Sequence, residues 1–153
     1  IRESLFVKMP LLAAVWSVTT VIIPLVDQNI DPASPFVIQQ TVCRFIFVFI
    51  LYIPFEIRDM EIDKSENIKT IPSVFGVGRT KISGALLVAL EIIIHHLMPV
   101  STLAIYALDL SSLIALAYIF VRVQDRESYF YKLFVDGTMI LRFIFLYFAY
   151  SMI

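Results

Sequence analysis

The sequence predicts an all-α integral membrane protein, a single bundle of five transmembrane helices over residues 1–153. Of these residues 59% are hydrophobic and 16% are charged, and the mean hydropathy is +0.87. Soluble domains contain about 45–50% apolar and about 25% charged residues. The excess of apolar side chains therefore requires lipid as the main solvent.

Five separate apolar stretches are long enough to cross a membrane. A helix needs about 20 mainly apolar residues to span a hydrocarbon core of about 30 Å. A lone strand would leave its backbone groups without partners in lipid, so each stretch is expected to be helical. The expected spans are residues 9–26, 36–55, 82–98, 102–121 and 138–153.

The charged residues of the connecting segments predict the orientation. Lysines and arginines occur in residues 1–8, 56–81 and 122–137, whereas residues 27–35 and 99–101 contain none. Short basic segments remain in the cytoplasm, which places the N-terminus inside and the C-terminus outside. The formal net charge of -1 excludes nucleic-acid binding driven by bulk positive charge. A single cysteine excludes an internal disulfide.

The cytoplasmic segment 56–81 begins with a group of acidic residues. If the second span continues as a helix, Glu56, Asp59 and Asp63 lie at positions i, i+3 and i+7 and share one face, while Glu61 points elsewhere. Like charges at these spacings repel, so they do not stabilise a helix. Oxygen ligands grouped in this way suit Mg²⁺, which is commonly held by one or two carboxylates together with phosphate and water.

Basic residues follow the acidic group. Lys69, Arg79 and Lys81 could contact phosphate oxygens and offset their negative charge. The pattern of an acidic face before a basic loop is therefore interpreted as a diphosphate site. The alternative is a solvated loop whose charges only keep it in water and fix the topology.

The order of residues in this segment also resembles a known motif. Asp59-Met-Glu61-Ile-Asp63, continuing to Lys69-Thr70-Ile71-Pro72 and then Phe75-Gly76, resembles the second aspartate-rich motif of the UbiA-type membrane prenyltransferases. That motif is written D-x-E-x-D followed by G-x-K-T-L-P. Asn67 stands where the family has Gly, and Asn is among the few residues that adopt the left-handed conformation readily. The five spans resemble helices five to nine of the family's nine-helix bundle.

The resemblance implies a Mg²⁺-dependent prenyltransferase, which transfers an isoprenoid chain from a polyprenyl diphosphate to a lipophilic, commonly aromatic acceptor. It implies location in the lipid bilayer, in bacteria the inner membrane. The implied catalytic metal ligands are Asp59 and Asp63, with Glu61 as a third metal ligand. Lys69, Arg79, Glu56 and Arg44 are the implied substrate-binding residues.

The first aspartate-rich motif of the family, N-D-x-x-D, does not occur in the sequence. Two explanations remain open: the chain is the C-terminal part of a longer protein, as the non-Met start suggests, or the protein never had this motif. The alternative function is a non-catalytic membrane protein or a small transporter that retains the helical bundle.

Three ionisable side chains fall near the middle of the expected spans. Arg44, Glu91 and Asp109 each cost at least about 2.5 to 3.5 kcal/mol at the membrane centre, so each needs a partner or a wet cavity. Either Arg44 and one acid line a substrate cavity, or Arg44 forms an internal ion pair with Glu91 or Asp109. His95 and His96 lie near the outer end of the third span and are expected at the membrane interface.

Overall fold

The computed structural model of the protein describes residues 7–65, 68–120 and 136–152, and these residues form helices and no strand. The all-α prediction is confirmed. The elements are α1 (Lys8–Ser17), a π-helical turn η1 (Val18–Ile22), α2 (Ile23–Asp27), α3 (Pro35–Ser65), α4 (Ile71–Phe75), α5 (Val77–His96), α6 (Thr102–Phe120) and α8 (Asp136–Ser151).

Within the described ranges, three helices are long and apolar enough to cross a membrane. They are the continuous run Lys8–Asp27, α3 and α6. The apolar part of α8 is shorter, Gly137–Ser151, and α5 contains Arg79, Lys81 and Glu91. Each expected span is therefore helical over most of its described residues, the third ending at His96 and the fifth at Ser151. Membrane-spanning length and composition hold for three of the helices.

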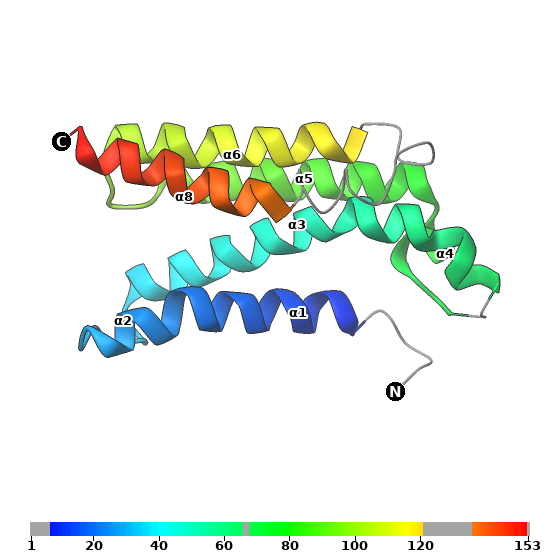
Figure 1. The fold of residues 1–153 in the computed structure, drawn as a ribbon, viewed down its shortest axis with the longest axis horizontal. Coiled ribbons are helices and arrows are strands. Elements are labelled where there is room, and N and C mark those ends of the chain that lie inside the picture. The colour runs from blue at the N-terminus through cyan, green and yellow to red at the C-terminus, as the bar shows by residue number, and fades with distance from the viewer. Residues whose placement is uncertain (1–6, 66–67, 121–135, 153) are drawn as a thin grey trace.

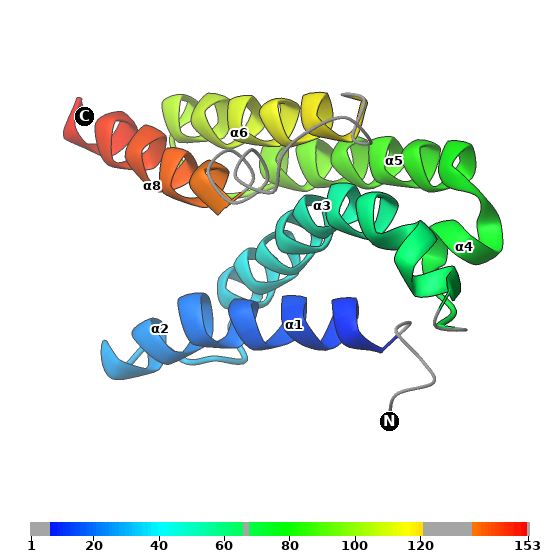
Figure 2. The same cartoon turned by 45° about the vertical axis from the view of Figure 1, so that its right-hand side comes forward.

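The helices are arranged around α3 (Figures 1 and 2). Helix α1 packs on α3, α3 packs on α5, α5 on α6, and α6 on α8. In both views α5, α6 and α8 lie on one side of α3, and α1 lies on the other. The start of α1 and α4 are at one end of the bundle, whereas the end of α8 and the loop between α5 and α6 are at the opposite end. We call these two ends of the bundle the α4 end and the C-terminal end.

Helices α3, α5 and α6 approach one another closely at Gly84. A Cβ atom added to Gly84 of α5 would lie 2.7 Å from Cδ1 of Ile119 and 2.9 Å from Cδ1 of Ile53. The absence of a side chain at Gly84 lets the three helices approach closely. Buried Phe47, Ile50, Val88 and Ala115 extend the same cluster.

Large apolar side chains cover much of the outer surface. Exposed examples occur on every long helix: Leu11, Ile38, Leu86, Leu110 and Phe143. Soluble monomers rarely expose apolar patches larger than a few hundred Å². The surface is thus compatible with a membrane protein, in which lipid chains cover these side chains.

The first membrane-length run changes its helical pitch at η1. Pro24 follows this turn and has no backbone N–H, and its ring excludes the carbonyl of the residue four positions earlier. Just before it, the hydroxyls of Ser17 and Thr20 donate to the carbonyls of Ala13 and Trp16 at 2.6 Å each. The wider π-helical turn accommodates the proline while the chain remains helical.

Candidate functional site

The acidic residues expected on one face do lie on a continuous helix. Helix α3 extends to Ser65, so Glu56, Asp59 and Asp63 share a face, called here the α3 acid face. Glu61 is exposed and, two residues away from both Asp59 and Asp63, projects from the opposite side of the helix. The structure therefore does not bring Glu61 to the other two proposed metal ligands.

The carboxylate of Asp59 forms an ion pair with the adjacent residue, Arg58. Nε of Arg58 donates to Oδ1 of Asp59 at 2.6 Å, and Nη2 donates to Oδ2 at 2.9 Å. The side chains are 29% and 41% exposed, so water and ions can compete with this pair. Within the described residues, no three His, Cys, Asp or Glu side chains are grouped so that they could hold a metal ion. A cation at Asp59 must therefore displace Arg58 and take most of its ligands from outside the protein.

Glu56 has a different environment. It lines a cavity of about 20 Å³ together with Met9, Thr80 and Ser83. Its Oε2 atom is buried and has no hydrogen-bond partner. Cavities of this size hold about one water molecule, so Glu56 contributes to the packing of α1, α3 and α5 and not to an open ligand site.

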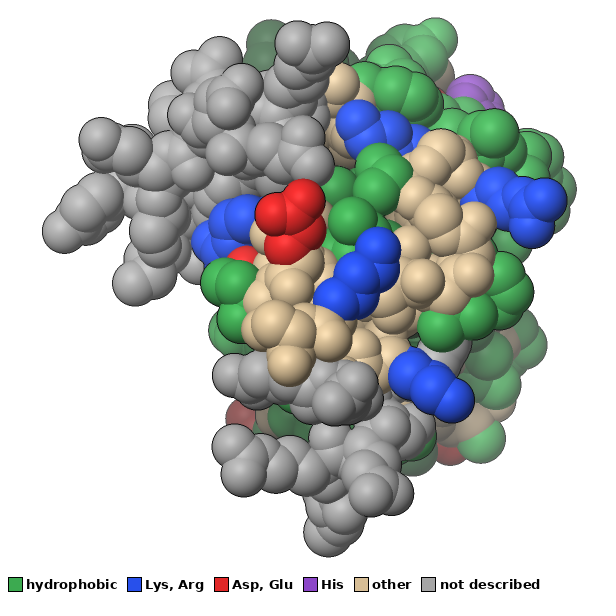
Figure 3. Space-filling view, turned by 90° about the vertical axis from the view of Figure 1, so that its right-hand side faces the viewer, with side chains coloured by type: hydrophobic (Ala, Val, Ile, Leu, Met, Phe, Trp, Pro, Cys, Tyr) green, Lys and Arg blue, Asp and Glu red, His purple; other side chains and the backbone are tan. Residues whose placement is uncertain are grey.

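Figure 3 shows the α4 end of the molecule, where several Lys and Arg side chains surround a small patch of Asp or Glu atoms. Lys69 and Arg79 are exposed, and the Nζ atom of Lys81 lies 5.9 Å from the centre of the Phe120 ring. Next to Lys69, Thr70 caps α4: its N–H donates to Oγ of Ser73 at 2.8 Å, and its Oγ1 accepts from the Ser73 N–H at 3.3 Å.

A cavity of about 720 Å³ lies along α3, between α1 and η1 on one side and α8 on the other. Its walls are mainly apolar and aromatic, and its charged side chain is Arg44. We call it the Arg44 cavity. The residues that line it are Trp16, Thr20, Arg44, Val48, Tyr52, Met139, Ile140 and Phe143.

The Arg44 cavity and the α3 acid face belong to the same side of α3. Arg44, Val48 and Tyr52 are spaced at i, i+4 and i+8, and Asp59 and Asp63 continue this row. At 3.6 residues per turn all five fall within about a third of the helix circumference. Pro54 lies between the two groups, inside the helix. An extended ligand in the cavity can thus direct one end toward the carboxylates.

A second polar region joins α5, α6 and α8. Glu91 is fully buried; its Oε1 accepts from Nη1 of Arg142 at 2.8 Å, and its Oε2 accepts from the hydroxyl of Ser112 at 2.9 Å. The guanidinium of Arg142 also lies over the Phe47 ring, 4.0 Å from its centre. The buried charge of Glu91 is thus paired and hydrogen-bonded, as a membrane interior requires.

Two histidines extend this region toward the C-terminal end. His95 is fully buried and lies between Arg142 and Asp109, with 3.2 Å between Nη2 and Nε2 and 2.9 Å between Nδ1 and Oδ1. Nε2 of His96, whose side chain is 55% exposed, lies 3.1 Å from Oδ2 of Asp109. We call the six side chains the polar network: Glu91, His95, His96, Asp109, Ser112 and Arg142.

The network corrects one expectation. Glu91 and Asp109 do belong to one polar group, but Arg44 is the partner of neither, so the predicted Arg44 ion pair is wrong. Of the two histidines, His95 is buried among charged partners and His96 is exposed. Arg142 was missed, although an arginine in an apolar stretch is itself a signal for a buried acidic partner.

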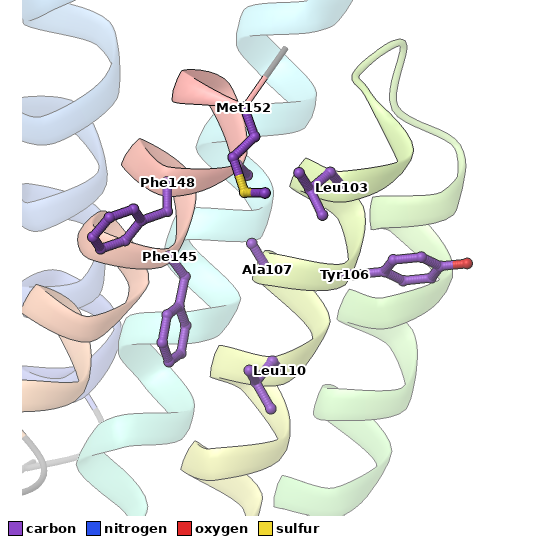
Figure 4. Close-up of a pocket in the computed structure, with 8 residues that line it drawn as sticks. Leu103, Tyr106, Ala107, Leu110, Phe145, Phe148 and Met152 are labelled. Carbon is purple, nitrogen blue, oxygen red and sulfur yellow. The ribbon is translucent and has the colours of Figure 1, made fainter.

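A further cavity of about 250 Å³ lies between α6 and α8 near the C-terminal end (Figure 4). Its walls are apolar side chains, among them Leu103, Leu110, Phe145 and Met152. The hydroxyl of Tyr106 points away from it. This cavity therefore offers only apolar contact.

Comparisons of the chain with protein families, with curated proteins and with solved structures find no match.

Proposed function

We propose that the protein is a membrane prenyltransferase-like protein, which transfers an isoprenoid chain from a polyprenyl diphosphate to a lipophilic acceptor. The observation that carries the proposal is the single side of α3 that holds both the Arg44 cavity and the α3 acid face. A polyprenyl diphosphate has an apolar chain, which suits the Arg44 cavity, and at one end of it a diphosphate, which suits a metal ion at the α3 acid face. A cavity of 300–1,000 Å³ is also typical of small-molecule sites.

The proposal includes five transmembrane helices and a cytoplasmic α4 end. The described basic residues outside the middle of the bundle support this orientation, because Lys8, Arg58, Lys64, Lys69 and Arg79 all belong to segments at the α4 end. Basic segments are retained on the cytoplasmic side. The bilayer supplies the isoprenoid chain laterally, while the diphosphate remains near water.

In the proposed site, the substrate is the Mg²⁺ complex of the polyprenyl diphosphate. Mg²⁺ needs only one or two carboxylates when phosphate oxygens and water supply its other ligands, and Asp59 and Asp63 supply these. Bound Mg²⁺ stabilises the negative charge of the leaving diphosphate. Lys69 and Arg79 are exposed and can approach the remaining oxygens.

Arg44 is assigned to the acceptor or to the lipid-side part of the substrate. It lies inside the cavity wall beside Trp16 and Tyr52. A guanidinium in an apolar environment favours an anionic or strongly polar group as its partner. Glu56, which faces the small cavity between α1 and α5, is not assigned a role in substrate binding.

The experiment is a binding titration of the full chain in lipid nanodiscs with farnesyl diphosphate, with and without Mg²⁺. We expect Mg²⁺ to be required, and we expect Asp59→Ala and Asp63→Ala each to weaken binding at least tenfold. Glu61→Ala is the matched control, because Glu61 is an exposed carboxylate on the same helix but on another face. This variant should bind farnesyl diphosphate with unchanged affinity. Unchanged affinity in the two Asp variants would reject the proposal.

The second candidate is a non-catalytic membrane protein. The polar network favours it, because buried ion pairs can fix the packing of helices without binding a ligand. For such a protein, the Arg58–Asp59 pair is not displaced by a ligand, and the charges of segment 56–81 only keep that segment in water. A correctly folded protein without Mg²⁺-dependent diphosphate binding would support this candidate.

A further inference from the structure

Arg44 differs from the other ionisable side chains near the middle of the described helices. There, Glu91 pairs with Arg142, and Asp109 pairs with His95. Arg44 has no hydrogen bond or ion pair with any described residue. Glu91 attracts it and Arg142 repels it, but both carboxylate oxygens of Glu91 already accept hydrogen bonds. Arg44 therefore carries a positive charge without a contact partner among the described residues.

The depth of Arg44 makes such a charge costly. Arg44 lies about 14 Å along α3 from Pro35, which is close to half of a hydrocarbon core of about 30 Å. A charged side chain at the centre of a membrane needs a partner or a water-filled cavity. The partner of Arg44 is therefore expected in the space that this side chain lines, which is the Arg44 cavity.

The Arg44 cavity combines apolar walls with one charged group. Val48 and Phe143 supply apolar side chains, and the hydroxyl of Thr20 already donates to the Trp16 carbonyl at 2.6 Å. Arg44 is therefore the lining side chain that selects for charge. The volume of about 720 Å³ lies within the range of sites for small organic molecules. This arrangement fits a ligand with a long apolar part and a single anionic end.

The cavity can be reached from the lipid. Trp16 of α1 and Ile140 and Phe143 of α8 line it, and all three side chains are also exposed on the outer surface. Lipid chains cover exposed apolar side chains in a membrane protein. A ligand dissolved in the bilayer can therefore enter between α1 and α8 without passing through water.

A fatty acid meets these conditions better than a phospholipid does. One carboxylate balances one guanidinium and can accept two parallel hydrogen bonds from it. A carboxyl group can also move through lipid in its neutral form, because desolvation disfavours the charged form. A phospholipid keeps its phosphate at the membrane surface, whereas Arg44 lies near the midplane.

We propose that the Arg44 cavity is a binding site for a long-chain fatty acid. The carboxylate pairs with Arg44, and the hydrocarbon chain lies along the apolar walls between α1 and α8. This site does not depend on the proposed function. Because the isoprenoid chain of the proposed substrate takes the same space, the fatty acid is also its competitor, and this second statement does rest on the proposed function.

The first test uses the fluorescence of Trp16, which lines the cavity and is the one tryptophan of the chain. Bromine quenches tryptophan at short range, so dibromostearate is added to the full chain in phosphatidylcholine nanodiscs. We expect quenching that saturates. The methyl ester of dibromostearate has the same chain without the charge, and it measures quenching by probe that is only dissolved in the lipid. Equal quenching by the acid and the ester would overturn the proposal.

Two variants that each remove one positive charge test the role of Arg44. Lys8 is exposed and lies on the same helix as Trp16, outside the cavity. Loss of a charge-assisted hydrogen bond weakens binding about tenfold or more. We expect this loss in Arg44→Gln and an unchanged affinity for dibromostearate in Lys8→Gln. Unchanged affinity in Arg44→Gln, or equal weakening in both variants, contradicts the pairing of the carboxylate with Arg44.

Thermal unfolding tests the site without any variant. A ligand that binds only the folded protein stabilises it, so stearate should raise the unfolding temperature of the unsubstituted protein more than stearate methyl ester does. If the two additives act alike, the site does not bind the acid and the proposal is wrong.

A phospholipid arm separates the two sources of an anionic lipid. Dibrominated phosphatidylglycerol in the nanodisc should quench Trp16 no more than dibrominated phosphatidylcholine does. Stronger quenching that is lost in Arg44→Gln would assign the cavity to an anionic phospholipid and overturn the proposal. These tests contain neither diphosphate nor Mg²⁺, so their failure is distinct from a failure of the proposed function.

Discussion

The α3 acid face and the polar network both contain Arg–carboxylate pairs, but the pairs differ in exposure and in sequence separation. In the acid face, Asp59 pairs with the adjacent residue Arg58, and both are partly exposed. In the network, Arg142 and Glu91 are 51 positions apart in sequence and almost completely buried. An exposed pair can exchange its partner for a ligand, whereas a buried pair connects helices. The second region therefore connects helices, whereas the first is the one in which the proposed function places ligand binding.

The largest expected effect is on the network. Arg142→Met leaves the Glu91 carboxylate buried without its cation, and breaking a buried pair in this way costs about 3–5 kcal/mol. The free energy of unfolding in detergent measures the loss. Arg79→Met, at an exposed position, is the matched control and should change it by less than about 0.5 kcal/mol. Similar losses in both variants would contradict the distinction between the two regions.

A double variant tests whether the loss of stability in Arg142→Met comes from the unpaired Glu91 carboxylate. Adding Glu91→Leu to Arg142→Met removes the uncompensated charge together with its partner. Replacing a buried pair by apolar residues is often neutral or stabilising, so the double variant should recover part of the stability that Arg142→Met loses. A further loss in the double variant would show that Glu91 acts through another partner, such as Ser112.

A smaller effect is expected at the cap of α4. Thr70→Ala removes the Oγ1 atom that accepts from the Ser73 N–H, and loss of such a cap costs about 1 kcal/mol. Hydrogen exchange of the α4 amides measures the local effect. Thr19→Ala is the control, because the Thr19 hydroxyl is exposed and bonds only within its own helix. Unchanged exchange in Thr70→Ala would show that the cap does not hold α4.

The smallest effect on stability is expected for Arg58→Ala. Exposed ion pairs contribute about 0–1 kcal/mol, so thermal unfolding should change little. The variant also frees the Asp59 carboxylate, and we expect the affinity for Mg²⁺ and farnesyl diphosphate to be maintained or raised. Lys64→Ala, at an exposed site on the same helix, controls for the loss of one positive charge. A stability loss comparable to that of Arg142→Met would remove the contrast between the regions.

Hydropathy predicted where the helices lie because burial in lipid depends mainly on local composition. The expected span at 102–121 corresponds to α6, Thr102–Phe120, almost residue for residue. Helical periodicity predicted that Glu56, Asp59 and Asp63 share one face, provided that the second span continues as a helix beyond residue 55. The π-helical turn was not predicted, since its signal is only one proline after several hydroxyl residues.

The partners in the network could not be predicted in the same way. Arg44 and Arg142 both lie in apolar stretches, and both could balance Glu91 by charge alone. The choice depends on how each helix is rotated in the folded bundle, where the guanidinium of Arg142 lies over the Phe47 ring. The contact between Glu91 and His95 is simpler, because residues four apart on one helix lie on the same face.

The 31 residues of α3 make it about 46 Å long, against a hydrocarbon thickness of about 30 Å. In the proposed orientation about a third of this helix extends beyond the lipid. One helix therefore carries both Arg44 in the wall of the cavity and Asp63 near water, with Pro54 between them.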